Sequence, residues 1–572
     1  MSLSVKHGVA IVVAGEAGQG IQTIESILTM VLKRSGYHVF ATKEYMSRIR
    51  GGSNSTLIRV GHERTPAHVD RIDVLVPLDD NALEHLASRI SRETMIIGER
   101  ENLQTLHDLL DIPFSGLAEK AGGKIYANTV AIAALLGILE GELNLLEEYL
   151  SDRFEKKGKS IVKGNLEAAR LGFQAGRELR SSGKTSFDLK KNPETANDIL
   201  ISGGAAVALG AISGGCNFIS SYPMSPGTAV LNFMAHHDSQ FGIVVEQAED
   251  EIAAVNMALG AWYAGARAMV TTSGGGFALM EEGVSLAGIT ESPLVVHVGQ
   301  RPGPATGMAT RTEQGDLDLV LHSGHGEFPR IVYAPGSVEE AFQLTRRAFN
   351  EADRYQVPVF VLTDQYFIDS YCSVPALDTG TADIEDHTVR TLADYKRYAF
   401  TEEGISPRGI PGFGEGLVCV NSHEHTEEGH ITEKIQMRNR MMEKRMGKLD
   451  PIVRDSVPPT LIGPEKYRVL VICWGSNYHI VAEAVSLLGK DDIAVLHFSQ
   501  VFPLPPETNE LLERAESTIV VENNYTGQFA RLLKAYAGLD TGHSIRQYNG
   551  RPFCFEALAK KILRLARKGD RK

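Results

Sequence analysis

Cysteine is scarce in this sequence and nowhere clustered. The chain of 572 residues has five, at positions 216, 372, 419, 473 and 554. A disulfide framework uses an even set of cysteines at close spacing, and a zinc or iron–sulfur site needs neighbouring thiolates. We therefore expect a reducing, cytoplasmic location, and no metal ion or cluster held by this chain.

Long apolar runs and an excess of positive charge are also missing. No stretch approaches the ~20 apolar residues that span a bilayer, and Asp+Glu outnumber Lys+Arg by 71 to 58. Neither a membrane nor a nucleic acid is therefore expected as a partner. At roughly 100–200 residues per domain, the length predicts about three to five domains.

Strands and helices alternate along the chain, which predicts an α/β fold. Residues 8–14, 21–34 and 37–42 read as strand, helix and strand, the start of a βαβ unit and of a parallel sheet. Composition then divides the chain into three α/β domains with two connections. These are a domain over 1–176, a polar linker over 177–197, a domain over 198–380, a charged connection over 381–465 and a smaller domain over 466–572.

A glycine-rich turn, GEAGQG at 15–20, joins the first strand to the first helix. Backbone amides and the helix dipole at such a turn can hold a phosphate, although Ala17 replaces the middle glycine of a dinucleotide motif. The basic segment at 46–54, with Arg50 beside two glycines, could complete a phosphate site. A tight packing turn and a solvated loop explain the two segments equally well.

Polar residues follow two strands of the second domain. The loop YPMSP at 222–226 is stiffened by two prolines and rich in hydroxyls, which suits recognition of a carbonyl or carboxylate. Arg301 follows another strand, where its guanidinium could hold a substrate carboxylate by two parallel hydrogen bonds. Thr310 ends the loop of glycines and prolines after it. A surface ion pair is the alternative for Arg301.

Carboxylates lie where a strand of the same domain turns into an alanine-rich helix. Glu249 and Glu251 are both at this helix start. Carboxylates at a helix N-terminus usually cap the helix or interact with its dipole. One of them could instead bind a ring nitrogen of a cofactor.

Two later segments have open roles. The histidine-rich segment HEHTEEGH at 423–430 is predicted to be a solvated or interface loop, because no fixed carboxylate or regular periodicity supports a metal site. The segment at 520–533, with Asn523 and Asn524, fits either anion binding or packing against another domain.

Taken in order, these segments resemble the 2-oxoacid:ferredoxin oxidoreductases, as an alpha subunit with a gamma domain fused in front. The resemblance rests on GEAGQG with SRIRGGSN, YPMSP, AEDEIAA, TTSGGGFALMEEG, QRPGPATGMAT and VVENNYTGQFA. It implies a CoA-associated gamma domain, a domain of the thiamine-enzyme pyrimidine-binding type and a transketolase C-terminal-like domain. It also implies reversible conversion of a 2-oxoacid and CoA to acyl-CoA and carbon dioxide, with reduction of ferredoxin.

The resemblance assigns one carboxylate to the cofactor. Glu251 best matches the catalytic glutamate that hydrogen-bonds the aminopyrimidine ring of thiamine pyrophosphate, and Glu249 is the runner-up. Pro223 would lie beside the same cofactor. The TSGGG turn at 272–276 departs from the TSGPG of the family, which puts the geometry of that turn in doubt.

Substrate contacts carry over in the same way. Arg301 matches the arginine that binds the 1-carboxylate of the 2-oxoacid, and Thr310 and Tyr222 would lie nearby. Ser225 stands where the family usually has threonine, so the hydroxyl is kept and the methyl is lost. The residues that would lie near coenzyme A are Gly18, Gln19, Gly20 and Arg50.

The resemblance implies that this chain holds only part of a thiamine site. The sequence has no GDG motif for Mg2+ and the diphosphate, and no cysteines spaced for a [4Fe–4S] cluster. The resemblance therefore implies a beta subunit that supplies Mg2+, the diphosphate site and the cluster. It further implies ferredoxin as the electron partner and a dimer of alpha–beta heterodimers.

The fused arrangement is most like the 2-oxoglutarate enzymes, which form succinyl-CoA. Pyruvate and branched-chain or aryl 2-oxoacids remain open as substrates. Two other classes also remain open: a thiamine-dependent synthase or transketolase-like enzyme without ferredoxin, and a noncatalytic CoA- or nucleotide-binding scaffold subunit.

Overall fold

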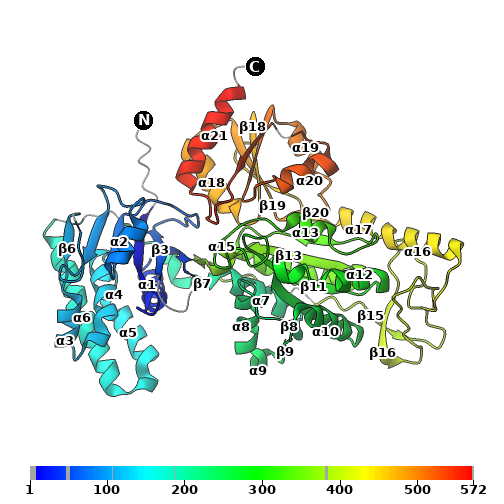
Figure 1. Ribbon diagram of the computed structural model, residues 1–572, viewed down its shortest axis with the longest axis horizontal. Coiled ribbons are helices and arrows are strands. Elements are labelled where there is room, and N and C mark those ends of the chain that lie inside the picture. Colours follow the sequence, from blue (N-terminus) through cyan, green and yellow to red (C-terminus); the bar gives the residue numbers. More distant parts are fainter. Residues whose placement is uncertain are drawn as a thin grey trace. The chain divides into compact units, whose positions relative to one another are not determined.

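The chain forms two compact units. The computed structural model describes residues 8–46, 52–105, 107–183, 185, 187, 189–379, 384–540 and 542–569. Unit 1 comprises residues 1–201 and 370–377, and unit 2 comprises residues 202–369 and 378–572 (Figure 1). Both units combine sheets with packed helices, which confirms the α/β class.

Unit 1 is built on an eight-stranded mixed sheet. In spatial order its strands are β6 (Leu109–Asp111), β5 (Met95–Gly98), β4 (Val74–Pro77), β1 (Val9–Glu16), β3 (Ser53–Gly61), β2 (His38–Glu44), β14 (Tyr371–Val374) and β7 (Ile199–Ser202). The expected parallel start is wrong at one place, because β3 lies antiparallel between β1 and β2. The short connection from β2 to β3 returns the chain as a hairpin, and a parallel pairing would need a long crossover.

Helices cover this sheet and pack on one another through glycine. They are α1 (Ile21–Arg34), α2 (Asp80–Leu86), α3 (Phe114–Lys120), α4 (Ala127–Ile138), α5 (Leu143–Phe154) and α6 (Lys159–Ser181). The helix α4 is buried nearly all round, as its continuous apolar run predicts. A Cβ on Gly172 or Gly176 of α6 would lie 2.3 or 2.1 Å from a carbonyl oxygen of α4. Only glycine therefore permits this approach of the two backbones.

Unit 2 contains a seven-stranded sheet that is parallel except at one edge. Its strands are, in spatial order, β20 (Gln500–Phe502), β12 (Ile331–Tyr333), β13 (Pro358–Asp364), β11 (Leu294–Gln300), β10 (Ala268–Ser273), β8 (Phe218–Ser221) and β9 (Val244–Gln247). Its helices are α7 (Gly203–Ser213), α8 (Thr228–His236), α9 (Asp238–Phe241), α10 (Glu251–Tyr263), α11 (Gly274–Phe277), α12 (Glu281–Thr290), α13 (Leu317–His322), α14 (Val338–Tyr355) and α15 (Gln365–Asp369). The carboxyl ends of β8, β10, β11 and β13 meet along one edge of the sheet.

A second sheet of unit 2 is formed by the C-terminal part of the chain. Its order is β17 (Thr460–Ile462), β19 (Ile493–Phe498), β18 (Val469–Trp474), β21 (Ser517–Glu522) and β22 (His543–Arg546). The helices α18 (Asn477–Leu488), α19 (Thr508–Glu513), α20 (Gln528–Ala537) and α21 (Phe555–Gly569) accompany it. All its pairs are parallel except β17 with β19.

A charged connection lies between the two sheets in sequence. It holds β15 (Thr388–Thr391), β16 (Arg408–Gly414), α16 (Ile435–Gly447) and α17 (Leu449–Arg454). Lys444 and Lys448 place their Nζ atoms 2.7 and 2.5 Å from Oε2 of Glu291, the C-cap residue that follows α12. All three side chains are buried, so this cluster fastens the connection to α12.

The two units divide the chain at other positions than the predicted domain boundaries. Residues 370–377, expected within 198–380, belong to unit 1, and β20, from 466–572, joins the seven-stranded sheet. The expected linker at 177–197 begins inside α6. Within the described parts of the chain, no helix has the length and apolarity needed to cross a membrane.

Candidate functional site

Several predicted residues meet at the carboxyl edge of the seven-stranded sheet. The parallel strands β8, β10 and β11 end at Ser221, Ser273 and Gln300. The loop at 222–226, the glycines of α11 and Arg301 therefore start from the same edge. In open α/β sheets this edge is the usual place for a ligand.

Glu251 is the better placed of the two candidate glutamates. Asp250 caps α10, because its carboxylate accepts a 2.7 Å hydrogen bond from the N–H of Ala253. Glu251 follows it, is only 3% exposed, and its Oε1 has no hydrogen-bond partner among the described residues. Glu249 is exposed. A buried acceptor without a partner is the feature that sequence spacing alone could not supply.

Burial also sets the charge behaviour of Glu251. Burial raises the pKa of its carboxyl, and the neighbouring charge of Asp250 adds to that rise. Glu251 therefore takes up a proton more readily than an ordinary glutamate does. A side chain of this kind can hold or pass a proton at a ligand atom near Oε1.

The TSGGG turn leaves room for this carboxyl. A Cβ on Gly276 would lie 2.5 Å from Glu251 Oε1 and 2.2 Å from the Thr272 hydroxyl. A larger residue at position 276 would therefore displace Glu251. Position 275, where the family pattern has proline, has only the carbonyl oxygen of Ala305 at 3.6 Å, so the glycine there is not forced by crowding.

Arg301 and the 222–226 loop are joined directly. The guanidinium of Arg301 donates a 2.7 Å hydrogen bond from one Nη to the carbonyl oxygen of Ser225. Arg301 is 9% exposed, and its Nε has no partner among the described residues. Burial lowers its pKa below the usual value. One Nη of the guanidinium is thus fixed by the protein, and the Nε–H can donate a hydrogen bond to an anion.

The other predicted site residues belong to the two loops that this bond joins. Tyr222, Pro223 and the Ser225 side chain are exposed, and Thr310 is half-buried in the loop after Arg301. The carbonyl oxygen of Ser225 links the 222–226 loop to Arg301. One edge of the sheet thus carries the buried carboxyl of Glu251, the buried guanidinium of Arg301 and the exposed, hydroxyl-bearing loop at 222–226.

Asp316 is a buried carboxyl of this edge that the sequence does not reveal. Its Oδ2 has no partner among the described residues, and a Cβ on Gly274 would lie 2.3 Å from its carboxylate oxygens. Burial and the nearby Glu313 raise its pKa to about 7, while the charge of Arg301 opposes that rise. No spacing rule marks an aspartate near the end of a long loop, so only the fold brings it to Arg301.

The glycine-rich turn of unit 1 is a compact structure with a pocket beside it. Gly18 and Gly20 have φ values of 98° and 82°, and Gln19 accepts a 3.0 Å hydrogen bond from the N–H of Glu16. Asn128 of α4 donates a 2.9 Å bond to the Gln19 carbonyl. Both residues line a pocket of about 230 Å3. Arg50 lies outside the described residues.

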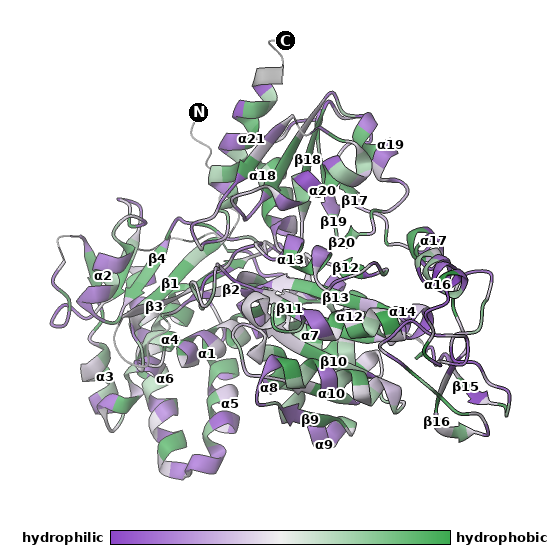
Figure 2. Ribbon diagram, turned by 45° about the vertical axis from the view of Figure 1, so that its right-hand side comes forward, coloured by the Kyte–Doolittle hydropathy of each residue, from purple (hydrophilic) through white to green (hydrophobic). Residues whose placement is uncertain are grey.

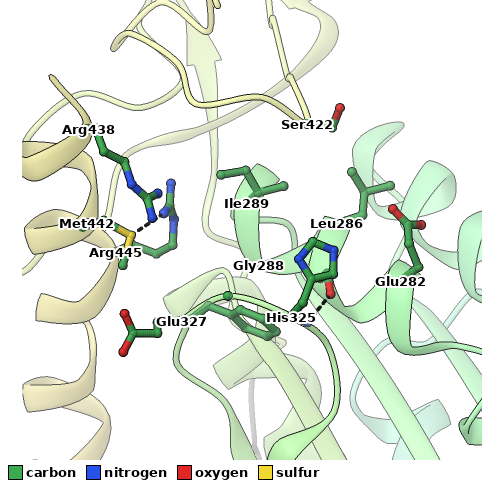
Figure 3. Close-up of a pocket in the computed structure, with 13 residues that line it drawn as sticks. Glu282, Leu286, Gly288, Ile289, His325, Glu327, Ser422, Arg438, Met442 and Arg445 are labelled. Atoms are coloured by element: carbon green, nitrogen blue, oxygen red, sulfur yellow. Dashed lines mark hydrogen bonds between the residues drawn. The ribbon is translucent and has the colours of Figure 1, made fainter. Parts of the chain in front are cut away.

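A further pocket of unit 2, of about 190 Å3, contains none of the predicted site residues. Figure 3 shows it between α12 and α16, with the guanidinium groups of Arg438 and Arg445 side by side on one wall. Glu424 accepts hydrogen bonds from both arginines. The two guanidinium groups thus share one carboxylate, which offsets one of their two positive charges.

The same contacts account for the histidine-rich segment. Beside Glu424, His425 is buried and stacks on Tyr398 with ring centroids 3.8 Å apart. Among the described residues, no group of three or more histidine, cysteine or acidic side chains is arranged to hold a metal ion. Through Glu424 the segment is hydrogen-bonded to two arginines of α16.

Two protein-family models match the chain. Residues 209–444 match the model described as pyruvate flavodoxin/ferredoxin oxidoreductase, thiamine diphosphate-binding. Residues 10–175 match the model described as pyruvate ferredoxin/flavodoxin oxidoreductase. The first match spans the candidate edge with Glu251 and Arg301, and the second spans the glycine-rich turn.

Individual proteins match as well, two of them over nearly the full length of this chain. The chain is 31% identical to the 2-oxoacid:ferredoxin oxidoreductase subunit alpha of Sulfolobus sp, over 98% of this chain and 97% of that relative. It is 34% identical to the 2-oxoglutarate synthase subunit KorA of Archaeoglobus fulgidus, over 58% of this chain and 89% of that one. The solved 2-oxoglutarate:ferredoxin oxidoreductase from Magnetococcus marinus, with 2-oxoglutarate, coenzyme A and succinyl-CoA bound, matches with a TM-score of 0.92 and 31% identity, covering 98% of this chain and 99% of that chain.

Proposed function

Since the chain belongs to the 2-oxoacid:ferredoxin oxidoreductase family, whose alpha subunits it matches, we propose that it forms the substrate half of an enzyme that converts 2-oxoglutarate and coenzyme A to succinyl-CoA and carbon dioxide. Ferredoxin takes up the electrons. The observation that carries the proposal is the buried, unpartnered carboxyl of Glu251 on the same sheet edge as the buried guanidinium of Arg301. The family predicted from the sequence is confirmed.

Glu251 fits the aminopyrimidine end of thiamine diphosphate. Its Oε1 is a buried acceptor with no protein partner among the described residues, so a ring N–H of a ligand would satisfy it. When bound, thiamine diphosphate supplies the carbon nucleophile that adds to the keto carbon and the electron sink for the bond broken in decarboxylation. Glu251 holds the proton that such a ring needs to change tautomer, and Pro223 is an exposed neighbour on the same edge.

Arg301 binds the 1-carboxylate of the 2-oxoacid. A charge-assisted hydrogen bond from its free Nε orients the keto carbon, while its bond to the Ser225 carbonyl keeps the guanidinium in place. The hydroxyls of Ser225, Thr310 and Tyr222 complete the polar lining. Because the guanidinium is largely buried, water screens its attraction for the carboxylate only weakly.

The identity of the 2-oxoacid is supported by similarity. Both the Magnetococcus marinus enzyme and the Archaeoglobus fulgidus subunit are named for 2-oxoglutarate. Pyruvate is the second candidate, because both matching family models carry its name. A substrate panel separates the two.

A beta subunit completes the site in this proposal. The sequence lacks the GDG motif and the clustered cysteines, so Mg2+, the diphosphate site and a [4Fe–4S] cluster are assigned to the partner. The surface around Glu251 is suited to a protein neighbour: Ile252 and Leu279 are each 52% exposed, and Met257 and Tyr263 are exposed on the same helix as Glu251. Figure 2 shows α10 as mostly hydrophobic. In the proposed assembly, this chain and a beta subunit form a heterodimer, and two heterodimers associate.

Coenzyme A is assigned to the glycine-rich turn of unit 1. The open backbone at Gly18 and the pocket beside Gln19 support this place, since no atom lies within 4 Å of a Cβ at Gly18. Gly20 is the N-cap of α1, whose N-terminal amides suit a phosphate. Arg50 is proposed as a cation for the same group.

Co-expression with the beta subunit tests the function. We expect the complex to reduce viologen only when a 2-oxoacid and coenzyme A are both present, fastest with 2-oxoglutarate. Faster reduction with pyruvate would replace the substrate and keep the reaction. No CoA-dependent reduction with any 2-oxoacid would refute the enzyme and favour a scaffold subunit.

A further inference from the structure

The loop after β11 is held from its far side by the C-terminal part of unit 2. This loop runs from Arg301 to Asp316 and carries Thr310, so it contains two of the four proposed substrate contacts. Gln314 lies near its end and is 1% exposed. Its neighbours come from 474–477 and 523–528, more than 150 positions further along the chain.

Three of the four hydrogen-bonding positions of the Gln314 side chain are engaged by that part. Its Nε2 donates to the carbonyl oxygen of Trp474 at 2.9 Å. Its Oε1 accepts from Nδ2 of Asn477 at 2.7 Å and from the N–H of Asn523 at 3.0 Å. A buried amide with both ends paired specifies one position of the chain.

The main chain on either side is fixed as well. The N–H of Gln314 donates to the carbonyl oxygen of Asn523 at 2.7 Å, and its own carbonyl accepts from Nδ2 of Asn524 at 3.0 Å. The next carbonyl, of Gly315, accepts from Nε2 of Gln528 at 2.7 Å. The two asparagines therefore pack against the substrate loop, and of the two roles open for 520–533 the structure shows this one.

Gln314 binds at the carboxyl ends of two neighbouring strands of the C-terminal sheet. Trp474 ends β18, Glu522 ends β21, and these strands are parallel neighbours. The chain leaves β18 toward β19 on one side and later reaches β21 on the other. The crevice at the carboxyl ends of such a pair is where open α/β sheets bind a ligand. Here a side chain of the same protein fills it.

We propose that the C-terminal part of unit 2 binds Gln314 in its ligand crevice and so positions the 301–316 loop for the 2-oxoacid. Gln314 is thus a positioning residue, and the C-terminal part of unit 2 sets the affinity for substrate. Two residues after Gln314, the N–H of Asp316 donates a 3.1 Å bond to Oε1 of Gln300, which connects the held end of the loop to the residue before Arg301. The substrate part of this inference rests on the proposed function.

Gln314→Met tests it in the assembled enzyme, because methionine keeps the size and removes three hydrogen bonds. Each such bond is worth roughly 2- to 12-fold, so we expect the KM for the 2-oxoacid to rise at least about 5-fold. The KM for coenzyme A and kcat should change by less than about 2-fold, since the loop is repositioned and the chemistry is not. Asn477→Ala, which removes one bond from the other side, should act in the same direction and more weakly.

Gln500→Met is the matched control. Gln500 is equally buried, lies in β20, and bonds the carbonyl of Pro503 and the N–H of Val457, neither of which belongs to the 301–316 loop. We expect a similar loss of thermal stability with the 2-oxoacid KM unchanged. Equal KM changes in both variants, or none in Gln314→Met and Asn477→Ala, would overturn the proposal.

Hydrogen exchange of the full chain gives a readout that does not depend on the reaction. Gln314→Met should speed amide exchange in 301–316 by at least about 10-fold relative to Gln500→Met, because the opening of the loop becomes easier. Unchanged exchange there refutes the positioning role. Faster exchange in an enzyme that turns over no 2-oxoacid would keep the positioning role and refute the proposed function instead.

Discussion

Replacing Glu251 by glutamine separates what its carboxyl does for catalysis from what it costs the fold. Glu251 is 3% exposed, and its Oε1 has no partner among the described residues. A buried polar group left unsatisfied costs about 1–3 kcal/mol, more when it is charged. Glutamine has nearly the same shape and no charge. We therefore expect Glu251→Gln to raise the free energy of unfolding by about 1 kcal/mol at pH 8.

The pH dependence of that gain follows from the raised pKa of Glu251. An acid whose pKa is higher in the folded than in the unfolded state destabilises the fold once it is ionised. The penalty grows as pH rises from the unfolded pKa through the folded one, and is complete above the latter. The advantage of glutamine should thus shrink at pH 5. Urea unfolding of the purified chain at the two pH values measures it.

Activity should move in the opposite direction. Loss of a positioned acid–base group lowers rates by about 100- to 10,000-fold, which viologen reduction by the assembled enzyme would detect. Glu249→Gln is the comparison, because the exposed Glu249 should change unfolding by less than about 0.5 kcal/mol and lose far less activity. A destabilised but active Glu251→Gln enzyme would refute both the role and the energetic reasoning.

Three further outcomes follow from charged groups of unit 2. Arg301→Ala should lower kcat/KM for the 2-oxoacid at least ~30-fold, about 2 kcal/mol for a lost charge-assisted hydrogen bond, with the KM for coenzyme A unchanged in steady-state assays. The 2-oxoacid KM should rise above pH 7, because the pKa of Asp316 is about 7 and its ionised carboxylate competes with the substrate for Arg301. Asp316→Asn should remove this pH dependence of KM. A KM that still rises in the variant would exclude Asp316 as the cause. Glu291→Gln leaves the buried Lys444 and Lys448 without their counter-charge and should cost about 3–5 kcal/mol in urea unfolding at pH 7. The pKa of Lys448 is already lowered to about 7 by burial, so the loss should be smaller at pH 9, and an equal loss would contradict the assignment.

Local patterns in the sequence predict individual elements well. The helix expected at 21–34 is α1 with the same ends, because an apolar stripe and a glycine turn mark both its face and its start. The position of β3 between β1 and β2 escapes such patterns. Pairing partners depend on the whole sheet, and the strand itself reads the same in a parallel or an antiparallel place.

The site shows the same division. Arg301 was recognisable because it directly follows a strand, and Glu251 because a helix begins there. Asp316 and Gln314 are polar residues in a loop without periodicity. Their burial depends on strands that are far away in the sequence, so spacing alone gives no sign of it. The choice between Glu251 and Glu249 likewise becomes physical only when one proves buried and the other exposed.

The strand β14 has a consequence for how the protein is made on the ribosome. It pairs with β2 in the sheet of unit 1, and the Ser373 hydroxyl lies 2.9 Å from the N–H of Val39. The nascent N-terminal unit therefore cannot close its sheet when residue 201 is synthesised. It must wait for residues 370–377, roughly 10–30 s later at about 5–20 residues per second. During this interval the edge of β2 is unpaired, a state in which nascent chains attract chaperones or one another.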